Sequence, residues 1–268
     1  GLYPINVGTI ADGKIYTFGS EHSPNEPMYK NIYVRCVDAN NGSEVWKILS
    51  YANPGSFMAP GFAIADGYMA YLNLYDHQMY VMGKGASQTT VTASPKVSTY
   101  GNSILIEGTV IDTASGTKQE EQVARFPNGV PAVSDASMED WMGYVYQQRP
   151  IPTDAVGVPV TIDVLDDNGN YRTIGTTTSD AYGTYSLTWT PDISGDFSVI
   201  AIFAGTESYW PSQAATSFYA AEPAPAPTQQ PATQQEPIGM YIAGAVAAII
   251  AAIAIGFVVT IMLLRKRQ

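Results

Sequence analysis

The sequence predicts a mainly β protein that ends in one transmembrane helix. Short runs of alternating apolar and polar residues recur between turn signals. The 268 residues include 24 glycines, 18 prolines and 18 tyrosines, a mixture typical of short strands and tight turns. Ile-Ala-Asp-Gly occurs twice, at residues 10–13 and 64–67. Near the C-terminus, the run from Tyr241 to Leu264 contains no charged residue.

The repeated Ile-Ala-Asp-Gly predicts two β-hairpins of the same design. Asp12-Gly13 and Asp66-Gly67 each lie between runs that alternate like strands. Asp-Gly is typical of type I′ hairpin turns, in which both central residues have positive φ. A repeat of about fifty residues made of short strands indicates propeller blades. We therefore expect partial β-propeller blades over residues 1–86.

A second motif in this region resembles a known repeat. Asp38, Gly42 and Trp46 in "VDANNGSEVWK" are similar to the D-x-x-x-G-x-x-x-W signature of PQQ-like propeller repeats. The resemblance implies that the Asp and the Gly shape a turn and that the Trp docks between neighbouring blades. It does not imply a bound quinone, because nothing in this chain matches the cofactor ligands of quinoprotein dehydrogenases.

The predicted propeller is incomplete. A closed ring needs about four to eight blades, and the second copy lacks the Asp-Gly-Trp run. The N-terminal "GLYPINVGTI" has neither an initiator Met nor an export signal. We therefore expect this chain to be the C-terminal part of a longer product.

Residues 87–220 predict an antiparallel β-sandwich. Runs such as "SILIEGTVID", "VPVTIDV", "YSLTW" and "FSVIAIF" alternate between turn signals. In the last run Phe197, Val199, Ala201 and Phe203 share one face. Residues 157–220 resemble bacterial and archaeal Ig-like surface modules. "DDNG" at 166–169 indicates a hairpin turn rather than a calcium loop, because no bidentate Glu follows at the required distance.

An insertion over residues 114–155 contains one helical pattern, "SDASMEDWMGYVYQQ". Met138, Trp141, Met142 and Val145 form an apolar stripe at helical spacing. One interpretation is a helix packed on the sandwich or on the propeller. The other is a binding element that offers aromatic side chains to a glycan or a partner protein; these are Trp141, Tyr144 and Tyr146.

The C-terminal segments predict a membrane anchor. Residues 221–237 are rich in Pro and Gln and indicate a semi-rigid stalk. Residues 238–264 are long enough to cross a bilayer core of about 30 Å. The basic tail at 265–268 should stay cytoplasmic by the positive-inside tendency. We expect a single-pass protein of the cell membrane with its body, residues 1–237, outside; a tail anchor with the body in the cytoplasm is the alternative.

The predicted anchor has a stripe of small residues. Gly244, Ala248, Ala252 and Gly256 recur every four residues. Such a stripe lets two helices approach closely in lipid, which predicts a homo-oligomer through the transmembrane helix. The alternative is that Ala and Gly are simply abundant in this span.

Composition excludes several chemistries. The formal net charge of −11 disfavours a nucleic-acid partner. The single cysteine, Cys36, is expected to be a small buried residue of a strand. Metal-ligand spacings such as CxxC or HExxH are absent from the sequence. No catalytic residue, no metal site and no cofactor are therefore predicted for this chain.

These features together favour a non-catalytic cell-surface protein whose partners are the lipid bilayer and a protein or glycan ligand. An exported quinoprotein-type oxidoreductase whose catalytic blades lie elsewhere, and an assembly scaffold for membrane complexes, are the alternatives. The single C-terminal anchor and the combination of modules resemble archaeal surface proteins. Asn41-Gly42-Ser43 is the one N-glycosylation sequon in the sequence, so Asn41 is a candidate for modification.

Overall fold

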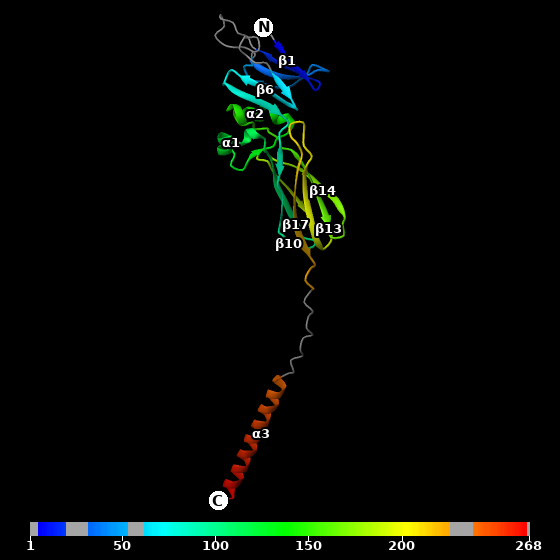
Figure 1. The fold of residues 1–268 in the computed structure, drawn as a ribbon. Coiled ribbons are helices and arrows are strands. Elements are labelled where there is room, and N and C mark those ends of the chain that lie inside the picture. Colours follow the sequence, from blue (N-terminus) through cyan, green and yellow to red (C-terminus); the bar gives the residue numbers. More distant parts are fainter. Residues whose placement is uncertain (1–4, 20–31, 53–61, 226–237, 267–268) are drawn as a thin grey trace. The chain divides into compact units, whose positions relative to one another are not determined.

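The computed structural model divides into two compact units, Gly1–Pro223 and Ala224–Gln268, which are described separately. The first unit is built mainly from antiparallel sheets with small helices, and the second contains one long helix (Figure 1). The expectation of a mainly β protein is thus confirmed. The residues that the structure describes are 5–19, 32–52, 62–225 and 238–266.

The first unit begins with two antiparallel sheets whose strands follow the order of the sequence. Each sheet opens with a hairpin turn at Asp-Gly, as predicted. Asp12 and Gly13 have φ of 48° and 67°, and Asp66 and Gly67 have φ of 51° and 79°, as a type I′ turn requires. The strands are β1 (Ile5–Ala11), β2 (Lys14–Gly19), β3 (Tyr33–Asp38) and β4 (Glu44–Leu49), then β5 (Ala63–Ala65), β6 (Tyr68–Asn73) and β7 (Gln78–Gly83).

An apolar cluster joins these two sheets. Phe18 and Val34 come from the four-stranded sheet, and Met69 and Tyr71 come from the three-stranded sheet. The ring of Tyr71 stacks on Tyr80 with 5.5 Å between ring centroids. The two sheets therefore pack on each other through one shared face of each.

The rest of the first unit is a sandwich of two sheets. One sheet has the order β10-β17-β16-β13-β14, and its β10–β17 pair is parallel. In the other sheet, β11 pairs with β8, β9, β12 and β15. The strands are β8 (Ser87–Thr89), β9 (Thr92–Ser94), β10 (Val97–Thr99), β11 (Ile104–Asp112), β12 (Val130–Pro131), β13 (Pro159–Asp166), β14 (Tyr171–Thr178), β15 (Thr184–Trp189), β16 (Gly195–Phe203) and β17 (Ser212–Ala221).

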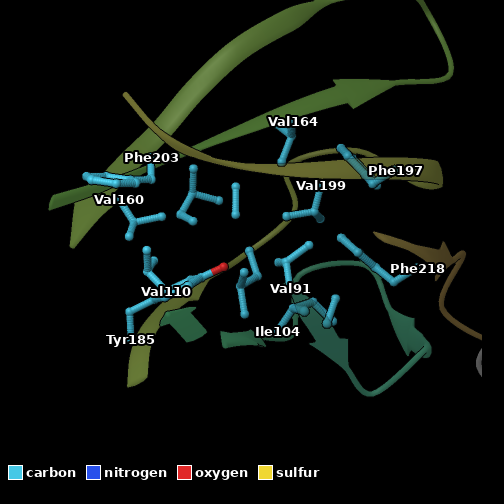
Figure 2. Packing of buried hydrophobic residues seen from close by; sticks show 14 of the residues in the cluster. Val91, Ile104, Val110, Val160, Val164, Tyr185, Phe197, Val199, Phe203 and Phe218 are labelled. Carbon is cyan, nitrogen blue, oxygen red and sulfur yellow. The ribbon is translucent and has the colours of Figure 1, made fainter. Parts of the chain in front are cut away.

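The core of the sandwich comes from the inward faces of both sheets. Figure 2 shows Ile104 and Val110 of one sheet lying opposite Val160 and Val164 of the other. From Phe197 to the end of β16 every second residue is fully buried, as the alternation predicted. These residues are Phe197, Val199, Ala201 and Phe203.

The segment between β11 and β13 is helical, as predicted, but it holds more than the one expected helix. The predicted helix is α2, which ends at the left-handed residue Gln148. The additional helix α1 has only six residues and its buried residue is the polar Gln122, so no apolar stripe marked it in the sequence. The helical elements are η1 (Ser115–Lys118), α1 (Glu120–Arg125), η2 (Asp135–Ser137) and α2 (Met138–Gln147).

The sandwich continues into the predicted stalk. Ala221 is the last residue of β17, pairs with Thr99 of β10 and accepts a hydrogen bond from the N–H of Tyr100. The start of the predicted stalk is therefore part of the sheet. The stalk residues 226–237 lie outside the described residues.

The second unit contains α3 (Ile238–Arg265). Among the described residues it is the one helix long and apolar enough to cross a membrane. This agrees with a single-pass anchor. Lys266 follows the helix, and the last two residues of the basic tail lie outside the described part of the chain.

Candidate interaction surface

The outer face of the β5-β6-β7 sheet is apolar and exposed. On β6 and β7 the side chains alternate, so that Tyr71 and Tyr80 point to the shared cluster while their neighbours point away from it. Tyr68, Met79 and Val81 on the outer face are 51%, 61% and 63% exposed. We name this set the outer apolar face; its members are Ala63, Ala65, Tyr68, Ala70, Leu72, Met79 and Val81.

Strand register makes the outer apolar face continuous. Ala70 is paired with Val81, and Leu72 is paired with Met79. Tyr68 is paired with Gly83, and a Cβ atom at Gly83 would lie 2.5 Å from the Tyr68 ring, so glycine lets the ring lie across β7. None of the seven residues that define the outer apolar face is charged. Its chemistry suits burial against another apolar surface, since exposed patches of this kind mark interaction sites.

Asp38 and Gly42 of the Asp-Gly-Trp motif lie at the β3–β4 turn. The Asp38 carboxylate accepts hydrogen bonds from the N–H groups of Asn40 and Asn41, at 2.8 and 3.1 Å. Gly42 has a φ of 76°, which a residue with a Cβ rarely adopts. These two residues therefore shape the turn in the manner that the resemblance implies.

Trp46 packs at the edge of the cluster between the two sheets. Its ring centroid lies 6.1 Å from that of Tyr16, and the side chain is half-buried. The resemblance implies a tryptophan docked between sheets. The role of Trp46 as a residue docked between propeller blades stays a prediction.

Helix α2 does not offer its aromatic stripe to solvent. Trp141 is 1% exposed, and its ring centroid lies 5.4 Å from Tyr144 and 6.4 Å from Phe126. Tyr144 and Tyr146 are half-buried in the same cluster. The structure thus supports the first interpretation of this helix, in which the stripe is packed inside the protein.

The opposite face of α2 holds the N-terminal sheets. The Glu139 carboxylate accepts a hydrogen bond from the N–H of Lys47 at 3.1 Å, and the Gln147 amide donates one to the carbonyl of Leu49 at 2.8 Å. The sequence did not reveal these contacts. Each joins a side chain to a main-chain atom more than ninety residues away, and neither leaves a pattern in the sequence.

Burial shifts the pKa values of several titratable groups toward their neutral forms. Asp112 is 6% exposed and accepts a hydrogen bond from the N–H of Ala114 at 2.7 Å, and burial raises its pKa. Burial, and then the nearby Asp112 carboxylate, raise the pKa of Tyr209. Burial also raises the pKa of the Cys36 thiol, which favours its neutral, less reactive form.

The turn at residues 166–169 is a hairpin turn between β13 and β14, as predicted. The buried Asp166 carboxylate accepts hydrogen bonds from the N–H groups of Asn168 and Asn170 and pairs with Arg172 at 3.2 Å. Its oxygens are thus engaged within the turn. Within the described ranges, no group of three or more His, Cys, Asp or Glu residues could hold a metal ion.

The four small residues predicted to form a helix–helix contact all lie within α3. A Cβ atom at Gly244 or Gly256 would meet nothing within 4 Å among the described residues. The prediction of an oligomer through Gly244, Ala248, Ala252 and Gly256 stays a prediction.

Comparison with known proteins gives little beyond the structure itself. No family model matches the sequence, and no curated protein matches it. A solved structure of Salmonella alpha-2-macroglobulin reacted with methylamine is similar over 82% of this chain, with 11% sequence identity and a TM-score of 0.29. The chain spans 12% of that protein's chain. A similarity at this level carries no argument about function.

Proposed function

We propose that this chain belongs to a single-pass, non-catalytic cell-surface protein. In this proposal α3 anchors it in the membrane, the basic tail is cytoplasmic, and the body is outside. The body presents a β-propeller and an Ig-like sandwich to a protein or another component of the envelope. Sheets β1–β4 and β5–β7 are two blades of the propeller.

The observation that carries the proposal is the outer apolar face. The opposite face of the same sheet is covered by another antiparallel sheet through the Phe18–Tyr71 cluster. A flat, uncharged face of alternating apolar residues suits a second sheet in the same way. The occupant we propose is therefore a further blade of the same repeat, carried upstream on the same polypeptide.

The sandwich supports the second module of the proposal. Strands β11 and β15 form one sheet with β8 and β9, and β13, β14, β16 and β17 form the other with β10. Two packed sheets of mostly antiparallel strands support the assignment to Ig-like modules, which are built in this way. Such modules serve as spacers and binding bodies on many surface proteins, but the fold by itself names no ligand.

Photocrosslinking in the full-length product tests whether a further blade covers the outer apolar face. A photoreactive residue at Val81 should crosslink to an upstream segment of the same polypeptide that contains another Asp-Gly hairpin. The matched control is Val97 of β10, which is 64% exposed against 63% for Val81 and lies on the sandwich. A crosslink from Val81 to a second copy would contradict the propeller, and one to a different membrane protein would favour the assembly scaffold.

Binding is tested on envelopes prepared from cells that lack the protein. Full-length protein in lipid nanodiscs should bind these envelopes saturably, and empty nanodiscs should not. Absence of saturable binding would contradict the surface-binding function. Binding to envelopes is measured without any cofactor. An oxidoreductase activity of the full-length product, the alternative function, would need its own assay.

A further inference from the structure

We propose that Asn41 is N-glycosylated, with an oligosaccharide joined to its Nδ2 atom. The inference rests on the proposed function, because it requires the body to be outside the membrane. Asn41-Gly42-Ser43 is the one N-x-[ST] sequence with x other than proline in the chain. The conformation of the turn that holds this sequon favours modification.

The turn between β3 and β4 is open to a large enzyme. Residues 39–45 are all exposed. A Cβ atom built on Gly42 would meet nothing within 4 Å among the described residues. A transferase and a bulky glycan can therefore approach this turn without displacing the surrounding structure that is described.

Hydrogen bonds in the turn fix the Asn41 side chain by its oxygen. The Oδ1 atom of Asn41 accepts the N–H of Ser43 at 2.8 Å, and the main-chain N–H of Asn41 donates to the Asp38 carboxylate at 3.1 Å. No hydrogen bond to the Nδ2 atom of Asn41 is recorded among the described residues. The turn thus holds the amide oxygen and leaves the amide nitrogen available to react.

The same turn opposes the competing fate of an Asn-Gly pair. Deamidation requires the main-chain nitrogen of Gly42 to attack the side-chain carbonyl carbon of Asn41. That nitrogen donates its hydrogen to the carbonyl of Asp38 at 2.9 Å. Holding the nitrogen in this bond slows the attack, so Asn41 persists as an amide and remains a substrate.

The proposed step balances with one co-reactant, an oligosaccharide linked through phosphate or diphosphate to a polyprenol. A bond forms between Nδ2 of Asn41 and the anomeric carbon of the first sugar. The bond from that carbon to the phosphate oxygen breaks, and the phosphate leaves with the electron pair. Nδ2 loses one proton to a base of the transferase, and no atom is oxidised or reduced.

Mass spectrometry of the intact glycopeptide from native membranes tests the inference. The peptide with Asn41 should carry the mass of an oligosaccharide rather than the small increase that deamidation gives. Asn41→Gln and Ser43→Ala should each abolish the added mass, while Ser43→Thr should keep it. Asn168-Gly169-Asn170 is a matched internal control: a hairpin turn with positive φ at its glycine but no hydroxyl residue two positions on, so it should stay unmodified.

A second sequon separates failure of this inference from failure of the proposed function. Tyr182 is 77% exposed in the turn before β15, and Gly183 has a φ of 78°. Tyr182→Asn creates a second sequon there, with the sequence Asn-Gly-Thr. Modification of the new site but not of Asn41 would overturn the inference and leave the outside location intact. Absence of modification at both sites, in cells that glycosylate a control protein, would contradict the outside location as well.

Discussion

The side-chain amide of Gln147, at the end of α2, donates a hydrogen bond to the main-chain carbonyl of Leu49 at 2.8 Å. Two residues earlier on the same strand, the N–H of Lys47 is bonded to Glu139 of the same helix. Strand β4 is the last strand of its sheet, so α2 covers main-chain groups on an edge that would otherwise be unpaired. The inserted helix thereby connects the N-terminal sheets to the sandwich.

Gln147→Leu should lower the free energy of unfolding by about 1 kcal/mol, because the Leu49 carbonyl loses its partner. It should also expose the N-terminal sheets to limited proteolysis before the sandwich. Chemical denaturation and timed digestion measure the two effects. Gln88→Leu, at an exposed position of β8, is the control and should change neither the stability nor the digestion pattern. Equal behaviour of the two variants would contradict a connecting role for the helix.

Trp141→Ala should cost about 3–5 kcal/mol of stability, because a fully buried aromatic side chain is removed. Thermal or urea unfolding provides the measurement. Trp210, which is 54% exposed, is the matched control, and its change to Ala should cost less than about 1 kcal/mol. A stable Trp141→Ala variant that instead lost ligand binding would restore the interpretation of α2 as a binding element.

Asp112→Asn should increase stability at neutral pH relative to the native chain. Burial raises the pKa of Asp112 above its ordinary value of 3.8, so the folded protein binds this proton more tightly than the unfolded chain. The resulting stabilisation is complete below pH 3.8 and is lost as pH rises through the raised pKa. Asparagine stays neutral and keeps an oxygen for the N–H of Ala114. The stability advantage of Asp112→Asn over the native chain should therefore grow as pH rises from about 4 to 7.

Asp166→Asn provides a control of opposite sign. Hydrogen bonds, chiefly from the main chain of Asn170, lower the pKa of Asp166 below 3.8. Its contribution is present above pH 3.8 and is lost as pH falls through the lowered value. Urea unfolding at several pH values measures both variants. If the stability difference between Asp112→Asn and the native chain did not change with pH, titration of the Asp112 carboxylate would not be its cause.

Protease added to intact cells should release a soluble body by cutting within residues 222–237. The expectation follows from α3 and from the basic residues after it, which favour the cytoplasmic side. Immunoblots with antibodies to the body and to a C-terminal tag would follow the two parts. A protected body with a digested tag would reverse the topology.

Gly244→Ile combined with Gly256→Ile should weaken self-association of the anchor, because the larger side chains prevent close approach of two helices. Val246→Ile, on another face of α3, should leave association unchanged. Energy transfer between labelled copies in bilayers gives the measurement. If the native span is monomeric in bilayers, the small residues have no oligomeric role.

Sequence patterns predicted the elements whose signal is local. The Asp-Gly turns were predictable because two adjacent residues determine the backbone, and β16 because four alternating residues share one environment. The three-residue strands β8, β9 and β10 gave too short a pattern to be seen. The hydrogen bonds of Glu139 and Gln147 to β4 depend on main-chain partners distant in sequence. The half-buried state of Trp46 depends on how two sheets pack on each other. Neither property is encoded by neighbouring residues.

Strand β17 is the last element of the body before the chain leads to the anchor. It has β16 as its antiparallel neighbour on one side and β10 as its parallel neighbour on the other. The hydrogen bonds to both neighbours lie across the strand, so a pull applied along β17 would load them in shear. Many bonds must then fail together in shear instead of opening one after another. A load applied at Ala221 along β17 would therefore act on the pairings with β16 and β10 at the same time.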